Sequence, residues 1–198
     1  MTTAHFSKIH TLLMTHRVVF STQNLAMLWG IQDRRQLLES IKYYVRKKQL
    51  SSVTRGIYKL DRTDILFEPA SVASALIPFS YISLDTALFR HGIIYQFTSA
   101  IHSMSQESRT VTIQDVTYIF HTAKPTILSI RDGLIIESQE YTIASPERAV
   151  VDALYLSSHR GFDHISELQP HLLTQIAAQY GNARLMHDVQ SLIQRIDQ

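Results

Sequence analysis

The chain has 198 residues, of which 45% are hydrophobic, enough for one large or two small packed cores. It contains no cysteine, which excludes a disulfide framework, a thiolate metal site and a cysteine nucleophile. No apolar run reaches the length of about eighteen residues that spans a bilayer, and residues 1–10 lack the pattern of a signal peptide. We therefore expect a cytoplasmic protein.

The formal net charge of +2 hides a strong difference between two parts of the chain. Residues 1–60 contain ten Lys or Arg and two Asp or Glu, a balance of +8, whereas residues 61–198 contain nine basic and fifteen acidic side chains, a balance of −6. A basic segment favours a polyanion partner, because released counterions drive such binding. The absence of a basic amphipathic helix with a wide aromatic face favours nucleic acid over a membrane surface.

Apolar spacing in the first sixty residues predicts three helices followed by a hairpin. A helix over 3–14 is followed by an extended stretch over 18–20, and a second helix begins at Ser21-Thr22 and runs through Leu28. After a turn at 29–31, Asp33 can cap a third helix. Residues 52–54 and 57–60 predict two strands joined at Arg55-Gly56. This order predicts a winged helix-turn-helix domain over residues 1–61.

If the third helix enters the major groove, its exposed polar residues are the candidates for DNA contact. Arginine pairs with guanine and glutamine with adenine, while residues near the helix end suit phosphate. A helix N-terminus also binds phosphate, and a wing tip reaches the flanking backbone or the minor groove. The predicted base contacts are Arg34, Arg35, Gln36 and Ser40; the phosphate contacts are Tyr43, Arg46, Lys47, Thr22 and Gln23; the wing contacts are Arg55 and Lys59.

Residues 62–198 alternate between helical and extended patterns, which predicts a mixed α/β C-terminal domain and places the whole chain in the α+β class. Predicted strands cover 100–105, 109–113, 116–122, 127–130, 134–137 and 141–144. Predicted helices lie between Pro69 and Pro78, from Ser83 as cap to Gly92, after the cap Ser145 and Pro146, over 165–173 with Asp163 as cap, and after Asn182 as cap.

Three motifs in order give the chain a family resemblance. They are Thr54-Arg55-Gly56-Ile57-Tyr58, then Tyr81-Ile82-Ser83-Leu84 through Ala87-Leu88 to His91-Gly92, then Ser145-Pro146-Glu147 leading to Ala149-Val150-Val151-Asp152. With these motifs the chain resembles the AbiEi family of antitoxins over residues 5 to about 175. The resemblance implies a transcriptional autorepressor that binds inverted repeats upstream of its own operon. It also implies an antitoxin that opposes, indirectly, a nucleotidyltransferase-like toxin encoded beside it.

Within that resemblance, residues 34–59 would carry DNA contact and the C-terminal domain would carry antitoxicity. Two alternatives remain open on the same residues. One is a stand-alone transcriptional regulator, and the other is an adaptor whose winged helix docks a protein rather than DNA.

A nuclease is the main enzymatic alternative. Metal-dependent cleavage needs clustered carboxylates, often with a lysine two residues after an acid, yet none of the six lysines follows an acid in this way. Asp85, Glu147 and Asp152 are the candidate acids, but Arg148 precedes Asp152 by one helical turn and predicts a structural ion pair. We therefore expect no catalytic residues.

Metal and cofactor signatures are also missing from the sequence. The ten histidines are scattered, and only His164 and His171 could share a helix face, without a third ligand. The six glycines form neither a phosphate loop nor a dinucleotide fingerprint. The sequence therefore predicts a DNA-binding protein without cofactor or metal, and not an enzyme.

Overall fold

The computed structural model describes residues 7–61, 67–137, 140–158 and 160–196. The chain is α+β and divides into two compact units: Met1–Pro78 with Ser138–Glu140, and Phe79–Glu137 with Tyr141–Gln198. The first unit thus runs to Pro78 rather than ending at the predicted residue 61. The reason is that helix α4 (Ala70–Leu76) packs on strands of the first unit.

The first unit contains the predicted order of helices and strands, apart from residues 3–6 of the first helix, which lie outside the described residues. Its three strands form an antiparallel sheet in the order β1-β3-β2. Before α4 the elements are α1 (Lys8–Leu13), β1 (Val19–Ser21), α2 (Thr22–Trp29), α3 (Arg34–Arg46), β2 (Leu50–Thr54) and β3 (Ile57–Leu60).

An apolar core joins the helices of this unit to its sheet. Trp29 and Tyr58 pack against it while staying partly exposed, and the indole Nε1 of Trp29 donates to the carbonyl of Lys8 at 3.0 Å. Such an arrangement suits aromatic residues that carry a polar group. The buried members of the core are Leu12, Phe20, Leu25, Ile31, Leu37, Ile41, Leu50 and Leu60.

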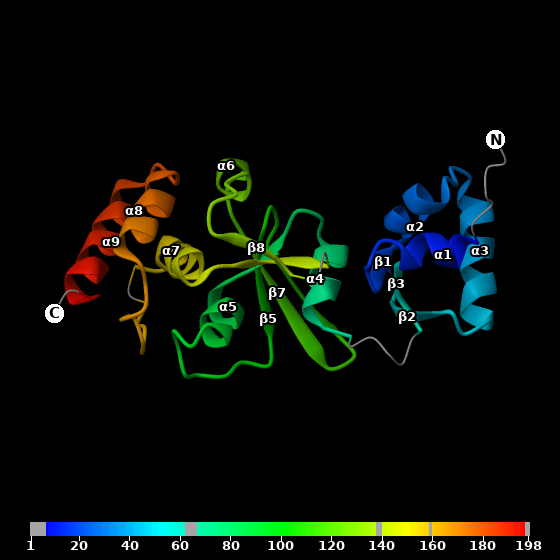
Figure 1. The fold of residues 1–198 in the computed structure, drawn as a ribbon, viewed down its shortest axis with the longest axis horizontal. Helices are drawn as coiled ribbons and strands as arrows, with labels where there is room; N and C mark the ends of the chain where they lie inside the picture. Colours follow the sequence, from blue (N-terminus) through cyan, green and yellow to red (C-terminus); the bar gives the residue numbers. More distant parts are fainter. Residues whose placement is uncertain (1–6, 62–66, 138–139, 159, 197–198) are drawn as a thin grey trace. The chain divides into compact units, whose positions relative to one another are not determined.

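The second unit is built on a six-stranded mixed sheet in the order β6-β7-β5-β4-β9-β8. Strands β5 and β7 are parallel, as are β4 and β9, and the other neighbours are antiparallel. Figure 1 shows α8 and α9 side by side, with α7 between them and the sheet. The elements are β4 (Tyr81–Ile82), α5 (Leu84–Arg90), β5 (Ile101–Ser105), β6 (Arg109–Ile113), β7 (Val116–Thr122), α6 (Pro125–Leu128), β8 (Leu134–Glu137), β9 (Tyr141–Ala144), α7 (Pro146–Leu156), α8 (Pro170–Ala178) and α9 (Ala183–Ile196).

Two element predictions in this unit are wrong. The strand predicted over 127–130 is instead the short helix α6, which begins with Pro125 at its first turn and buries Ile127. The helix predicted over 165–173 begins only at Pro170, because Asp163 does not cap it. Its carboxylate instead accepts from the backbone N–H of Tyr95 at 2.8 Å. Proline at the first helical position explains both helix starts.

Within the part of the chain that is described, no helix combines the length and apolar character needed to cross a membrane.

Helix α7 carries a buried ion pair between two fully buried side chains, Arg148 and Asp152. The guanidinium Nε lies 3.4 Å from the Asp152 carboxylate, which confirms the predicted pair. The same carboxylate accepts hydrogen bonds from the hydroxyls of Ser83 at 2.7 Å, Tyr81 at 3.1 Å and Tyr180. Ser83 therefore does not cap α5 with its side chain, contrary to the prediction.

The two terminal nitrogens of the Arg148 guanidinium have hydrogen-bond partners, whereas its buried Nε has only the ion-pair contact with Asp152. The guanidinium donates to the Tyr81 hydroxyl at 2.8 Å and to the carbonyls of Ile127 at 3.1 Å and Asp132 at 3.2 Å. It also lies 5.1 Å from the ring centroids of both Tyr81 and Tyr180. A buried charge is costly unless such partners compensate it. The network therefore joins α7 to β4, α6 and the end of α8.

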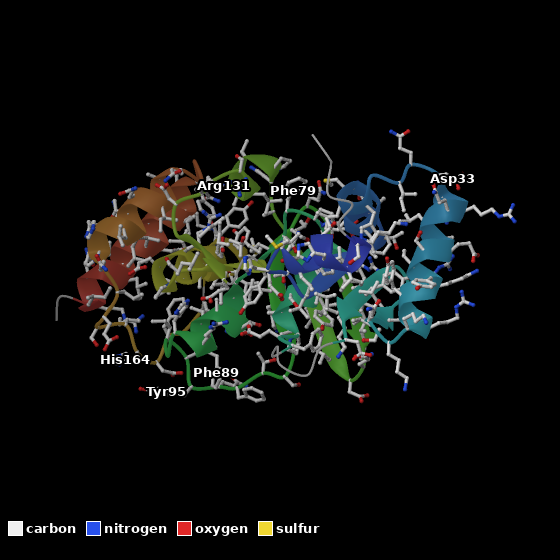
Figure 2. All side chains as sticks on the ribbon, turned by 45° about the vertical axis from the view of Figure 1, so that its right-hand side comes forward. Asp33, Phe79, Phe89, Tyr95, Arg131 and His164 are labelled. Carbon is white, nitrogen blue, oxygen red and sulfur yellow. The ribbon has the colours of Figure 1, made fainter. Side chains whose placement is uncertain are left out.

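We predict that Arg148→Met lowers the free energy of unfolding by about 3–5 kcal/mol, because it leaves the Asp152 carboxylate buried without its cation. Urea denaturation measures this change. The control is Arg131→Met, which removes an exposed arginine of the same unit (Figure 2) and should alter the free energy by less than about 0.5 kcal/mol. Equal effects of the two substitutions would contradict a structural function for the pair.

A second polar feature of the sheet is a histidine pair, His102 on β5 and His121 on β7. Nδ1 of His102 lies 3.1 Å from Nε2 of His121, and the ring planes differ by 14°. The ring centroids are 5.4 Å apart, whereas the two nitrogens are 3.1 Å apart. The difference is about the width of one imidazole ring, so the two nearly coplanar rings face each other through their edges. One nitrogen donates and the other accepts, which two imidazolium ions cannot do.

Burial lowers the pKa of both histidines below the ordinary value of 6.5, although Asp85 opposes this effect. For His102, the His121 and Arg160 side chains lower the pKa further. The unfolded chain then binds more protons than the folded chain between the lowered and ordinary pKa values. The free energy of unfolding therefore falls as the pH drops below about 6.5.

We predict that replacing both histidines by glutamine removes part of the loss of stability between pH 7.5 and pH 5.5. Glutamine keeps hydrogen-bonding groups but does not titrate in this range. Melting temperatures of the variant and the parent protein across the pH series measure the difference. His171→Gln, an exposed substitution, is the matched control and should follow the parent. A double variant with an unchanged pH profile would contradict the linkage.

Candidate nucleic-acid interface

Helix α3 separates an apolar face from a charged one. It buries Leu37 and Ile41 in the core of the first unit. Its start is fixed by Asp33, whose carboxylate accepts from the backbone N–H of Gln36 at 2.7 Å, as predicted. Helix α2 ends before it at Gly30, whose φ of +63° is one that glycine adopts readily. The caps fix where α2 ends and α3 begins, and the burial of Leu37 and Ile41 leaves the other side of α3 exposed.

The predicted base-contacting residues Arg34, Arg35 and Gln36 are all exposed in the first turn of α3. Figure 2 shows Asp33 at this end of the helix, with side chains projecting along its outer face. Ser40 differs from the other three. It is half-buried, and its hydroxyl accepts from the Lys8 ammonium at 2.7 Å, which places it on the side of α3 that faces α1.

The predicted phosphate contacts Tyr43, Arg46 and Lys47 are exposed at the other end of the helix. The Tyr43 ring is 47% exposed, and the Lys47 ammonium lies 5.9 Å from its centroid. The Tyr43 and Tyr44 rings meet edge to face with their centroids 5.1 Å apart, and the Tyr44 centroid lies 5.5 Å from that of Trp29. The exposed tyrosine is therefore supported from the core by two further aromatic rings.

Between these two groups lie Glu39 and Lys42, which form an exposed ion pair at 2.9 Å. The hydrogen bond and charge of Lys42 hold the pKa of the Glu39 carboxyl below its usual value. The sequence prediction omitted Lys42 from the interface, although its spacing of seven from Arg35 and four from Arg46 places it on the same helical face. Lys8 was also omitted, since its approach to α3 depends on tertiary packing.

The β2–β3 turn supplies the predicted wing residues. Arg55 is exposed at the turn, next to Gly56 with a φ of +82°. Lys59 lies further along β3 and is half-buried, with its ammonium 4.7 Å from the Phe67 ring centroid. Arg55 is thus free to reach a partner, whereas Lys59 is already engaged in a cation–π contact.

At the start of α2, the two predicted phosphate contacts also differ. Gln23 is exposed. The Thr22 hydroxyl donates to the Gly56 carbonyl at 3.1 Å, and the Thr22 backbone N–H donates to the same oxygen at 2.8 Å. Both donors of Thr22 are therefore used within the protein, which leaves Gln23 as the exposed side chain at this helix start.

The chain matches no protein-family model and no curated protein. Among the residues described, no three His, Asp or Glu side chains are grouped so as to hold a metal ion. The candidate acids each have a structural contact. Asp85 pairs with Arg160, Glu147 accepts from the Ser145 hydroxyl at 3.1 Å, and Asp152 pairs with Arg148.

Proposed function

We propose that the first unit is a winged helix-turn-helix that binds double-stranded DNA through α3 and the β2–β3 turn. The chain is then a transcriptional regulator that binds inverted repeats upstream of its own gene. The observation that carries this proposal is the set of exposed cations on α3. Arg35, Lys42 and Arg46 lie on the side away from the buried Leu37 and Ile41, and Arg34 and Lys47 are exposed at the two ends of the helix.

The arrangement of charge along α3 supports a major-groove docking. Arginine and glutamine occupy the first turn of α3, where a recognition helix contacts base edges. Arg46 and Lys47 lie at the C-terminal end of α3, where the DNA sugar-phosphate backbone would pass. Both ends of the helix are thus suited to different parts of one duplex.

The structure around α3 supports a rigid interface rather than a flexible basic segment. The helix is capped by Asp33, anchored through Leu37 and Ile41, and backed by Tyr44 and Trp29. Side chains on a rigid helix lose less conformational freedom on binding, which favours a specific complex.

On the resemblance to the AbiEi family, we propose further that the chain is the antitoxin of a nucleotidyltransferase-like toxin, with DNA as the partner of the first unit and antitoxicity in the second. This second unit is acidic on balance. No catalytic step is part of the proposal.

We predict that Arg35→Ala weakens binding to the DNA upstream of the gene by about 1–3 kcal/mol and relaxes preference over a scrambled duplex. Lys47→Ala should weaken binding to both duplexes alike and reduce the salt slope by about 1. Fluorescence anisotropy across a salt series measures both effects.

Arg131→Ala is the control for this experiment, because it removes the same charge from an exposed site of the second unit. It should leave affinity for both duplexes unchanged. If the parent protein binds the two duplexes equally and weakly, the regulator proposal fails and a protein-docking adaptor becomes the better account. Loss of duplex integrity during incubation with divalent metal would instead favour a nuclease.

Antitoxicity is tested separately by expression with the neighbouring toxin gene. We predict that the full chain restores growth and that Arg35→Ala, which alters only the DNA-binding unit, restores it equally when expressed from an unrelated promoter. Growth rate after induction is the measurement. Failure of the full chain to relieve toxicity would leave a stand-alone regulator as the function.

A further inference from the structure

The β2–β3 turn is held by the start of helix α2. The carbonyl of Gly56 accepts two hydrogen bonds from Thr22, one from its backbone N–H at 2.8 Å and one from its hydroxyl at 3.1 Å. The two residues are 34 positions apart in the chain, so the contact is a tertiary one. A turn at the end of a hairpin is therefore fixed at its tip as well as along its strands.

The donor side of this contact is itself rigid. Ser21, the residue before Thr22, pairs with Ile57 in the β1–β3 ladder and caps α2. Its hydroxyl accepts from the Asn24 backbone N–H at 3.1 Å, and the Asn24 side chain accepts from the Ser21 N–H at 3.0 Å. This reciprocal capping box satisfies two backbone donors at the helix start. Thr22 is thus held by the β1–β3 ladder before it and by the capped first turn of α2 after it.

The acceptor side is a glycine in the left-handed region. Gly56 has a φ of +82°, and a Cβ at this position would lie 3.5 Å from the Thr22 hydroxyl. Glycine allows the turn its left-handed conformation, while Thr22 selects one position of the carbonyl. Arg55, immediately before Gly56, is exposed in this turn.

We propose that Thr22 is a positioning residue for DNA binding, which fixes the turn so that Arg55 is held ready to contact the duplex. The inference rests on the proposed function of the first unit. Thr22 then acts through Arg55 and does not itself contact phosphate, because its hydroxyl hydrogen is donated to Gly56. A turn ordered before binding avoids an entropic cost that a free turn incurs on binding.

The test is a double-mutant cycle on DNA affinity, using the full chain and the duplex from upstream of the gene. Thr22→Val keeps the shape of the side chain and removes the hydroxyl donor, and should weaken binding about three- to tenfold. Thr22→Ser keeps the donor and should bind like the parent. In the Arg55→Ala background, Thr22→Val should have no further effect, because the residue it positions is absent.

The same substitution in the Arg35→Ala background is the matched control. Thr22→Val should there retain its full three- to tenfold effect, about that of one hydrogen bond, because Arg35 lies on α3 and is positioned independently. A general loss of structure would reduce affinity in both backgrounds, so the difference between them separates positioning from folding. Gly56→Ala disturbs the turn from the other partner and should show the same dependence on Arg55.

Four outcomes decide the inference. A full effect of Thr22→Val in the Arg35→Ala background, with none in the Arg55→Ala background, supports it. An equal effect in both backgrounds overturns it, as does an Arg55→Ala variant that binds like the parent while Arg35→Ala binds weakly. These last results leave the proposed DNA binding intact, whereas a parent protein that fails to prefer the upstream duplex overturns both proposals.

Discussion

The carboxylate of Asp152 is the group on which the second unit depends. It is fully buried, and its compensation comes from the Arg148 guanidinium and the hydroxyls of Tyr81, Ser83 and Tyr180. Tyr81 lies on β4, Ser83 lies at the start of α5, and Tyr180 follows α8. None of these donors satisfies the carboxylate alone. Burial raises the pKa of Asp152, and the arginine and hydroxyls oppose that effect. Because a half-satisfied buried network costs more than an apolar core, the elements that meet at α7 are stable only together.

The first unit is organised differently. Its main cluster is apolar, and many of its polar contacts are at helix ends, as at Asp33, Ser21 and Thr22. The half-buried Glu140 carboxylate also accepts from the backbone N–H of Val18. The cations of α3 take no part in the apolar cluster and remain exposed on the outside. The separation of an apolar core from exposed cations suits a domain whose surface contacts a polyanion. Substitutions on the outer face of α3 can then change binding while the core maintains the fold.

The sequence predicted helix starts correctly where the capping side chain bonds a backbone N–H only a few residues away. Asp33, Ser145 and Asn182 each accept a backbone N–H three residues later, so their helices begin where the sequence places them. The prediction failed where a distant partner takes the polar group. Ser83 donates to Asp152, 69 residues away, instead of capping α5, and Asp163 binds the backbone of Tyr95. The side chain of a potential capping residue can bond either its own helix start or a distant group, and tertiary packing determines which of the two it contacts.

By itself, the sequence determined the elements of the first unit, the segregation of charge and most of the exposed positions of α3, because helical periodicity and counted charges are local properties. Only the tertiary structure decided which polar side chains were already engaged. Ser40 accepts from Lys8, 32 residues away, and Thr22 donates to Gly56, so both are drawn toward the protein, whereas Arg35 remains free on the outer face. The physical reason is that a hydrogen bond requires its donor and acceptor to meet within about 3 Å, and which distant residues meet is fixed only when the chain packs.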